Sequence, residues 1–455
     1  MKNGKRSSFS GKLGYVLAAA GASVGLGNIW RFPYLAAKYG GGIFLIIYIV
    51  LALTFGYTMI VAETAIGRMT RKSPVGAFKS FGKKKWLSFG GWINAVIPVL
   101  IVPYYSVIGG WVIKYLVEYF RGNAKLLAED GYFTNFISNG VSTELCFVAF
   151  CAFTLIIIFA GVQNGIERVS KIMMPILIVL SVIIAVYSVT RPGALAGVKY
   201  FLVPNVKNFS WMTVVSAMGQ MFYSLSIAMG ILITFGSYMK KDTAIEDSTR
   251  NVEVFDTGIA IMAGLMIIPA VFAFSGGDPD TLQAGPSLMF ITIPKVFQNM
   301  GFGTVIGIVF FLLVLFAAVT SSIALTESAV STFEDELGWG RKKATVLVGV
   351  IMLVLGSLSS LGYGPLAGIK IIGMQFLDLF DFLTNSVMMP IAALLTSLLV
   401  SRVVGIDKIE EEIIHGESAF RRKKVFVVMI KYLCPVFAII ILLSSVANAL
   451  GWIKM

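Results

Sequence analysis

The first long apolar run of this chain is interrupted in its middle by glycines. Residues 14–34 are GYVLAAAGASVGLGNIWRFPY, in which glycines at 21, 25 and 27 are followed by Asn28, Arg31 and Pro33. Glycine lowers helix stability and the residue before a proline avoids the α region, so a helix here should part into two halves. Unwound backbone at membrane depth is tolerated only where it lines a cavity or meets a ligand. The run therefore predicts a membrane helix that is broken at a binding site.

The simpler alternative is an unbroken glycine-rich helix that packs closely on its neighbours, which is common in membranes. Asn28 and Arg31 lie within the same few turns. They favour the binding site, because a cation inside the membrane needs a partner and a role.

The composition places the chain in a membrane and argues against several other classes. Of its 455 residues 57% are hydrophobic and 13% are charged, which indicates an integral membrane protein. The net charge of +13 comes from short basic clusters between apolar runs, so we expect no nucleic-acid partner. The three cysteines lack metal-ligand spacing and the single histidine lies in a charged loop. No nucleophile with a base partner is visible, so we do not expect an enzyme, and the basic start lacks the small-residue cleavage site of a signal peptide.

Runs of about twenty apolar residues predict eleven spans. They are residues 13–38, 43–69, 90–120, 144–160, 167–190, 211–239, 253–275, 303–335, 344–361, 375–401 and 426–451.

The sixth run carries a second interruption. Its sequence GQMFYSLSIAMGILITFGSYM contains Ser224, Ser226, Ala228 and Gly230 within an apolar stretch. Two interrupted helices that each open a block of five suggest an inverted repeat with a site at the midplane, as in many secondary transporters. The predicted fold is an all-α membrane protein with two inverted five-helix repeats and an eleventh helix, in which helices 1 and 6 are unwound at mid-membrane.

This organisation predicts a single transporter domain over residues 1–455. It consists of a tail at 1–12, a first repeat at 13–190, a second repeat at 211–401 and helix 11 at 426–451. The Lys and Arg clusters place the N-terminus in the cytoplasm and the C-terminus outside. Residues 276–300 suggest a re-entrant helical hairpin or cap, with an inert loop nearly as plausible.

Polar groups gather at one predicted depth. Besides the first break they are Tyr104 and Tyr105, Ser224 and Ser226, Asp256, and the residues from Thr320 to Ser322. Each has a structural explanation, since tyrosines can form belts, hydroxyls can bond their own helix, and Asp256 could face water. The set as a whole fits a sodium ion, which takes oxygens from carbonyls, hydroxyls and carboxylates. The half-helix after the break would direct its free N–H groups toward a carboxylate, so a zwitterion fits beside the sodium.

Several motifs together resemble the neurotransmitter:sodium symporter family, in its short bacterial branch with eleven helices. They are GASVGLGNIWRFPY with the following GGG, ETAIGR, PYY, GQMFYSLSIAMG, GPSLMFITIP and AAVTSSIAL. The match covers nearly the whole chain. It implies sodium-coupled amino-acid uptake by alternating access, through a multi-pass protein of the bacterial inner (cell) membrane.

The resemblance implies two sodium sites. The first would use the Ser23 carbonyl, Asn28, Ser224, Asp256 and the substrate carboxylate. The second would use the carbonyls of Gly21, Val24 and Ala317 and the hydroxyls of Thr320 and Ser321.

The resemblance also implies a substrate site. The carboxylate should meet the N–H groups of Leu26 and Gly27 and the Tyr105 hydroxyl. The amine should meet the carbonyls of Ser23, Tyr223 and Ser224 and the Ser226 hydroxyl. The lining of the side-chain pocket is expected to be Ile101, Tyr105, Tyr223, Met229, Ser321 and Leu325.

For gating, the resemblance implies an outer pair of Arg31 with Asp381 over a lid of Tyr105 and Tyr223. Asp378 competes for the role of Asp381, which we prefer from its place before PheLeuThr. The inner gate would use Arg6, with Phe9 where the family has a tryptophan. Glu63 resembles the acid in helix two that supports the unwound segment.

The expected substrate is a neutral, hydrophobic amino acid, because the pocket candidates carry no charge. Ala228 lies where several family members have glycine, so small or medium aliphatic substrates come first and aromatic ones second. A carboxylate at Asp256 can supply the negative charge that chloride supplies in many animal members, so we expect no chloride requirement. The alternative function is a sodium-dependent amino-acid sensor without net transport. Besides sodium, substrate and the lipid bilayer we expect no further partner. We expect the protein to be a monomer or a weak oligomer.

Overall fold

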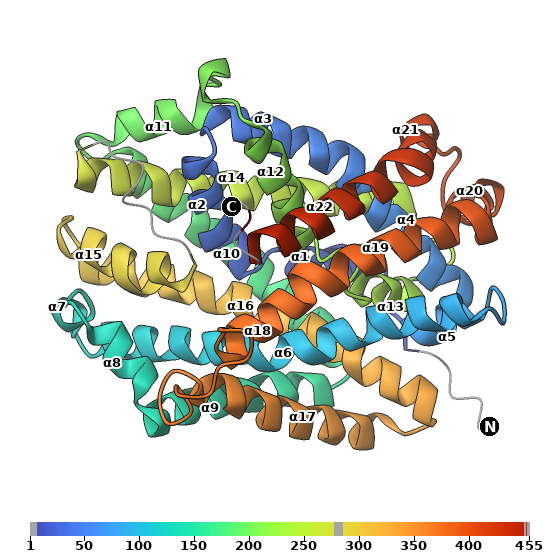
Figure 1. Cartoon of the computed structure of the whole chain (residues 1–455), viewed down its shortest axis with the longest axis horizontal. Coiled ribbons are helices and arrows are strands. Elements are labelled where there is room, and N and C mark those ends of the chain that lie inside the picture. The colour runs from blue at the N-terminus through green and yellow to red at the C-terminus, as the bar shows by residue number, and fades with distance from the viewer. Residues whose placement is uncertain (1–6, 277–284, 450–451, 453–455) are drawn as a thin grey trace.

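The computed structural model describes residues 7–276, 285–449 and 452 of the chain. Within these residues the regular elements are helices, and pairing between extended residues is limited to two isolated bridges. The long helices lie side by side along the long axis of the molecule (Figure 1).

Nine helical segments in the described part of the chain are long and apolar enough to cross a membrane. They are Gly42–Thr70, Lys85–Phe120, Gly140–Phe159, Val162–Val189, Ile245–Ser275, Gly303–Leu337, Arg341–Leu361, Phe376–Val404 and Lys423–Ala449. The pair Lys12–Ser23 and Gly27–Lys38 passes the same test as one span bent by 53°. Helices α12 (Trp211–Ser224) and α13 (Ile231–Tyr238) occupy the sixth predicted span, residues 211–239.

Several of these spans consist of more than one labelled element. The second span is α3 (Gly42–Leu51), η2 (Ala52–Gly56) and α4 (Tyr57–Thr70). The third is α6 (Lys85–Phe120), the fourth α9 (Gly140–Phe159), and the fifth η3 (Val162–Glu167) with α10 (Arg168–Val189). The seventh to ninth are α14 (Ile245–Ser275), α16 (Gly303–Leu337) and α17 (Arg341–Leu361). The tenth span consists of α18 (Phe376–Asp381), η7 (Phe382–Met388), α19 (Met389–Leu398) and η8 (Leu399–Val404). The eleventh span consists of α21 (Lys423–Val428), η9 (Met429–Leu433) and α22 (Cys434–Ala449).

Both predicted helix breaks are present. Helix α1 (Lys12–Ser23) ends in an extended residue, Val24, and η1 (Gly27–Arg31) with α2 (Phe32–Lys38) continues after it. Between α12 and α13, Ser226 and Ala228 have left-handed backbone with φ of 53° and 59°. This conformation is unfavourable for residues that carry a Cβ, so surrounding contacts must hold the segment.

The glycines at the first break are explained by the close approach of neighbouring side chains to the backbone of this segment. A Cβ on Gly27 would lie 2.3 Å from the Tyr223 ring, and one on Gly25 would lie 2.7 Å from the Ser321 hydroxyl oxygen. Real Cβ atoms do not come so near, so only glycine lets α12 and α16 pack against the unwound segment.

Several predicted spans begin too late in the chain. Residues 90–120, 144–160, 167–190, 253–275 and 344–361 correspond to helical segments that start at Lys85, Gly140, Val162, Ile245 and Arg341. Hydropathy detects only the part of a helix that lies in hydrocarbon. The backbone hydrogen bonds continue into charged residues at the membrane surface, which the apolar pattern does not report.

The connection at 276–300 is partly helical. Residues 277–284 lie outside the described residues, but η6 (Leu288–Thr292) and α15 (Ile293–Gln298) bury the side chains of Leu288, Met289 and Phe290. For this part the inert-loop alternative is wrong. The Phe290 carbonyl also accepts a hydrogen bond of 2.7 Å from Tyr115 on α6.

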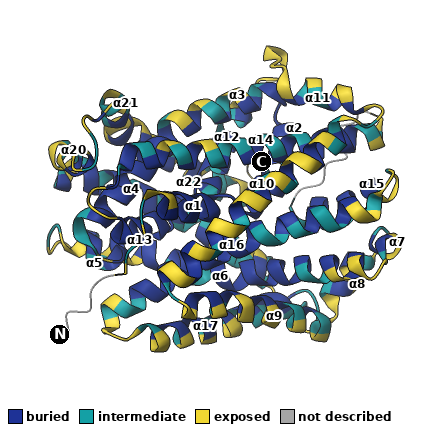
Figure 2. Ribbon diagram, turned by 180° about the vertical axis from the view of Figure 1, so that it is seen from behind, coloured by how far each residue is buried: buried dark blue, intermediate teal, exposed yellow. Residues whose placement is uncertain are grey.

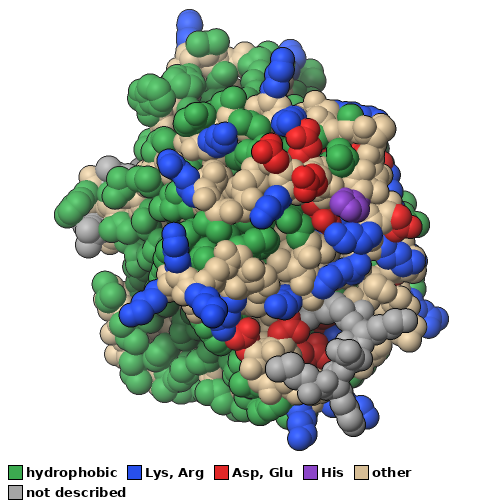
Figure 3. Space-filling model, turned by 90° about the vertical axis from the view of Figure 1, so that its right-hand side faces the viewer, with side chains coloured by type: hydrophobic (Ala, Val, Ile, Leu, Met, Phe, Trp, Pro, Cys, Tyr) green, Lys and Arg blue, Asp and Glu red, His purple; other side chains and the backbone are tan. Residues whose placement is uncertain are grey.

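The remaining helices are short and lie at the two ends of the bundle. One end of the bundle carries α15 together with α7 (Ala124–Leu127), α8 (Tyr132–Ser138) and α11 (Ala194–Leu202) (Figure 1). The other end carries α5 (Pro74–Lys79) and α20 (Ile406–Ile414). Buried residues fill the middle of the bundle around α1 and α13 (Figure 2). The face at the α5 and α20 end carries many Lys and Arg side chains (Figure 3).

Candidate functional site

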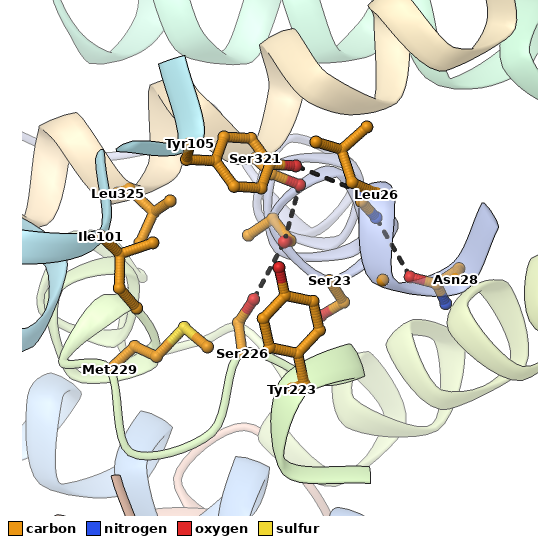
Figure 4. Close-up of a pocket in the computed structure, with 13 residues that line it drawn as sticks. Ser23, Leu26, Asn28, Ile101, Tyr105, Tyr223, Ser226, Met229, Ser321 and Leu325 are labelled. Carbon is orange, nitrogen blue, oxygen red and sulfur yellow. Dashed lines mark hydrogen bonds between the residues drawn. The ribbon is translucent and has the colours of Figure 1, made fainter. Parts of the chain in front are cut away.

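The two helix breaks meet around a small cavity of about 30 Å³. Its walls come from the first break, α6, the break between α12 and α13, and α16 (Figure 4). The lining residues are Ala22, Ser23, Gly25, Leu26, Gly27, Asn28, Ile101, Tyr105, Tyr223, Ser226, Met229, Ser321 and Leu325.

One part of the cavity is polar. The Leu26 N–H donates to the Tyr105 hydroxyl at 3.3 Å, and the Gly25 N–H donates to the Asn28 side-chain oxygen at 3.1 Å. The Ser226 hydroxyl donates to the Ala22 carbonyl at 2.9 Å. The N–H groups of Gly25 and Leu26 directly precede η1, where N–H groups favour an anion, and the Ala22 carbonyl lies at the end of α1, where carbonyls favour a cation.

The opposite part of the cavity is apolar. Ile101 from α6, Met229 from the second break and Leu325 from α16 lie together on this part (Figure 4). A ligand with a charged head and an uncharged side chain fits this division of polarity.

A first oxygen cluster joins the two breaks to α14. The Asn28 amide donates to the Ser224 hydroxyl at 2.9 Å and to an Asp256 carboxylate oxygen at 2.8 Å. Ser224 itself bonds both carboxylate oxygens, at 2.9 and 3.0 Å. Tyr48 on α3 donates to Ser224 at 3.0 Å and to Asp256 at 3.1 Å. All four side chains are buried, so the structure brings Asn28, Ser224 and Asp256 together as the sequence suggested.

A second oxygen cluster lies between the first break and α16. The Ser321 hydroxyl lies 3.3 Å from the Gly21 carbonyl and 3.4 Å from the Val24 carbonyl. The Thr320 hydroxyl lies 3.2 Å from the Ala317 carbonyl. Ser321 thus contacts two carbonyls of the first break, and Thr320 lies beside Gly21, where an added Cβ would be 3.1 Å from the Thr320 Cβ; the contact between Thr320 and Ala317 lies within α16.

Both clusters have the chemistry that a sodium ion requires. They present buried carbonyl, hydroxyl and carboxylate oxygens, which are hard ligands, while the Asn28 amide oxygen accepts the Gly25 N–H. Within the described residues no group of three or more His, Cys, Asp or Glu side chains could hold a metal ion.

Glu63 supports the second break from α4. Its carboxylate accepts the Ala228 N–H at 2.7 Å, and its other oxygen has no hydrogen-bond partner among the described residues. This bond satisfies a backbone donor that the unwound segment leaves free.

A larger cavity of about 690 Å³ lies on the far side of Tyr223 from the small one. Tyr223 lines both cavities, and the Arg31 guanidinium lies over its ring at 5.2 Å. Arg31 and Asp381 both line the larger cavity but form no ion pair within 4.0 Å. Asp381 instead accepts hydrogen bonds from Tyr104 at 3.2 Å and Asn385 at 2.6 Å. Asp378 accepts one from Tyr363 at 3.2 Å.

At the opposite end of the bundle, the first described residues of the chain pack against neighbouring helices. Phe9 is buried against the rings of Tyr15, Phe235 and Tyr238. Its aromatic packing needs no indole nitrogen. Arg6 lies outside the described residues.

Sequence reasoning missed several residues of these clusters. Tyr48 completes the first oxygen cluster, Ala22 supplies a cavity carbonyl, and Gln220 donates to the Gly27 carbonyl at 3.0 Å. At the chain start Glu167 accepts the Ser10 N–H at 2.9 Å and also bonds the Ser10 hydroxyl. Gln220 could have been noticed as a polar residue in an apolar run, whereas Tyr48 and Glu167 carry no such signal.

Comparison with known proteins agrees with this geometry. The family model described as "Sodium:neurotransmitter symporter family" matches residues 6–127 and 134–452. The chain is 34% identical to an uncharacterized sodium-dependent transporter, YhdH, of Bacillus subtilis, over 98% of this chain and 99% of the relative. It is 26% identical to the human sodium- and chloride-dependent GABA transporter 2, over 90% of this chain and 75% of the relative.

Among solved structures, the crystal structure of MhsT in complex with L-phenylalanine is similar to this one. The TM-score is 0.86 and the sequences are 34% identical, over 97% of this chain and all of MhsT.

Proposed function

Because the chain belongs to the sodium:neurotransmitter symporter family, we propose that it imports a neutral, hydrophobic amino acid together with sodium. Membership makes it a multi-pass, sodium-dependent membrane symporter, and the family is one of transporters. The observation that carries the substrate proposal is the cavity between the two breaks, with backbone groups for a zwitterion at one part and apolar side chains at the other.

The charged head of the substrate is held by the unwound backbone. The carboxylate meets the N–H groups of Leu26 and Gly27 and the Tyr105 hydroxyl. The amine meets the carbonyls of Ser23, Tyr223 and Ser224 and the Ser226 hydroxyl. The side chain lies in a pocket lined by Ile101, Tyr105, Tyr223, Met229, Ser321 and Leu325.

The side chain of the substrate is uncharged and small to medium in size. None of the described residues that line the cavity carries a charged side chain, which argues against acidic and basic substrates. Ala228, where several family members have glycine, narrows the space for a large side chain, which favours alanine, valine or leucine. Aromatic amino acids come second, and the complex of MhsT with L-phenylalanine supports the hydrophobic class.

Two sodium ions accompany the substrate. The first is bound by the Ser23 carbonyl, Asn28, Ser224, Asp256 and the substrate carboxylate. The second is bound by the carbonyls of Gly21, Val24 and Ala317 and the hydroxyls of Thr320 and Ser321. Each net charge that crosses a potential of 100 mV contributes about 2.3 kcal/mol to uptake. Because Asp256 supplies a negative charge beside the first ion, transport does not require chloride.

Alternating access uses one gate at each end of the site. Arg31 and Asp381 close the outer side above Tyr105 and Tyr223, and Arg6 and Phe9 close the inner side. The N-terminus lies in the cytoplasm and the C-terminus outside, since the basic clusters then face the cytoplasm. The whole chain acts as one domain in the bacterial cell membrane, as a monomer or weak oligomer.

The test is uptake of a panel of labelled amino acids into proteoliposomes, with an inward sodium gradient against a potassium control. We expect saturable, sodium-dependent accumulation of one or two neutral amino acids. Replacing chloride by gluconate at constant sodium should leave uptake unchanged. A collapse of transport in gluconate would overturn the chloride proposal.

Other outcomes would change the proposed function. Tight sodium-dependent binding without accumulation would indicate a sensor. Strong competition by tryptophan with none by alanine or leucine would reverse the substrate order, and no binding of any neutral amino acid would show that the substrate class is wrong.

A further inference from the structure

The segment that joins α11 to α12, residues 202–211, is exposed along its whole length and yet rich in large apolar side chains. Val206 is 77% exposed, Trp211 79% and Val203 59%, and Leu202 and Phe209 are also exposed. Contiguous apolar exposure of this kind marks a surface that is covered by something other than water. Figure 2 shows the segment as an exposed projection beside α11.

The depth of the segment follows from its contacts with the second span. Pro204 pairs with Gly41, which directly precedes α3. A Cβ on Gly42, the first residue of α3, would lie 2.5 Å from the Val203 carbonyl carbon. The segment therefore lies level with the end of a membrane span, where hydrocarbon meets headgroups.

The neighbouring surface of that span is itself suited to lipid. Ile46, Val50 and Leu53 are exposed at 44%, 53% and 46%, and their spacing places them on one helix face. The segment projects from the bundle beside α3 (Figure 1), so its apolar side chains extend this lipid-facing surface.

The polar residues of this region suit headgroups. Lys199 and Lys207 are exposed, and among the described residues neither forms an ion pair. The Asn205 side chain accepts the Lys207 N–H at 3.0 Å, which orders the short turn η4 (Val206–Asn208). Tryptophan and phenylalanine beside lysine are the residue types that occur at membrane interfaces.

We propose that residues 202–211 form an interfacial anchor, which inserts its apolar side chains into the lipid leaflet on this side of the membrane. In the orientation proposed above this is the outer leaflet. Lys199 and Lys207 meet lipid phosphates there. The anchor holds the first residue of α12 in lipid, and α12 carries Tyr223 and Ser224 at its other end. The inference rests on the position of the membrane and does not depend on the proposed substrate.

The experiment uses the full-length protein in which the native cysteines, Cys146, Cys151 and Cys434, are replaced by alanine. A nitroxide spin label is attached at Val206→Cys. The labelled protein is reconstituted in nanodiscs of zwitterionic and anionic phospholipid. Collisions with oxygen report hydrocarbon and collisions with a water-soluble nickel chelate report water. Labels at Val50→Cys and at Lys125→Cys, which is exposed on α7, serve as lipid and water references.

We expect the Val206 label to resemble the Val50 label, with oxygen favoured over nickel. A Val206 label that resembles the Lys125 label would overturn the anchor. Exclusion of both reagents, together with spin coupling between molecules, would show that a second copy covers the segment and would also overturn it. Sodium-dependent uptake by each labelled variant, measured in parallel, tests the proposed function separately.

Discussion

Among the residues that the structure describes, Tyr223 is the one that lines both the small cavity and the larger one. Its ring lies against Gly27 on one side and under the Arg31 guanidinium on another. Its hydroxyl points into the small cavity (Figure 4) and has no hydrogen-bond partner among the residues that the structure describes. A free hydroxyl in a binding cavity is available to the polar head of a ligand.

Tyr223→Phe removes this hydroxyl and keeps the ring. If the hydroxyl bonds the charged head of the substrate, the dissociation constant should rise about tenfold or more, since hydrogen bonds to charged groups contribute strongly. Equilibrium binding of the labelled substrate in sodium measures it. Tyr119→Phe is the matched control, because the Tyr119 hydroxyl is also unpartnered but lies outside the cavity. Equal affinities of the three proteins would contradict a role for the hydroxyl.

Asp256 is the only carboxylate in the first oxygen cluster, where it bonds Asn28, Ser224 and Tyr48. A buried carboxylate attracts a cation more strongly than an amide does, and it balances charge without an added anion.

Asp256→Asn keeps the size of the side chain and removes its charge. We expect the half-saturating sodium concentration of uptake to rise about tenfold or more, because the ion loses a charged ligand. We also expect chloride to stimulate the variant but not the wild type. Sodium titrations in chloride and in gluconate measure both effects, and an unchanged sodium response would argue that this cluster does not bind sodium.

At the scale of elements, the second break is held in shape by a helix from the other repeat. Glu63 on α4 accepts the N–H of Ala228, and Ala228 keeps a left-handed φ of 59°. An L-residue in this conformation costs about 1–2 kcal/mol relative to the right-handed form. Met229, the next residue, forms part of the apolar end of the cavity, so the backbone of this segment sets the room for the substrate side chain.

Ala228→Gly relieves the unfavourable conformation and removes a methyl group. The segment should then adapt more easily, so phenylalanine should compete better relative to alanine than it does in the wild type. Competition against the labelled substrate gives the ratio of the two inhibition constants. Ala196→Gly, at an exposed position of α11, is the control for the substitution itself. An unchanged ratio in Ala228→Gly would show that Ala228 does not restrict the side chain.

At the scale of the whole molecule, the two residues that we propose as the outer gate line the same cavity but are not paired. Arg31 contacts the Tyr223 ring, and Asp381 is occupied by Tyr104 and Asn385. The larger cavity lies between them. An ion pair that forms only when the two sides approach would be a two-state element of the kind that alternating access requires.

Asp381→Asn should therefore impair uptake more than binding. We expect uptake to fall about tenfold or more while the affinity of sodium-dependent binding stays within about threefold. The substitution removes a charged partner from the proposed outer gate and leaves the substrate site unchanged. Asp378→Asn, one turn earlier, is the matched control and should retain both activities. If Asp378→Asn lost uptake instead, Asp378 and not Asp381 would be the acidic residue of the outer gate.

The sequence by itself determined the class of the molecule and the positions of its breaks. Apolar run length, glycine and proline placement and basic clusters are local properties, and membrane insertion acts on them locally. They were therefore sufficient for the helices that can span a membrane, which number nine among the described residues or ten with the bent pair, and for the interruptions near Val24 and Ala228. The helix starts were less accurate, because backbone hydrogen bonding does not stop where hydrophobicity does.

Only the tertiary structure showed which further polar groups join those that the sequence had already placed together. Tyr48 stands in an apolar run and carries no local signal, yet it bonds Asp256 on a helix far along the chain. Glu167 reaches Ser10 in the same way across most of the first repeat. Such contacts depend on how helices rotate and pack against each other, and neighbouring residues in the sequence do not report that rotation. The unpaired state of Arg31 and Asp381 is likewise a property of one arrangement of the helices, which the sequence permits but does not select.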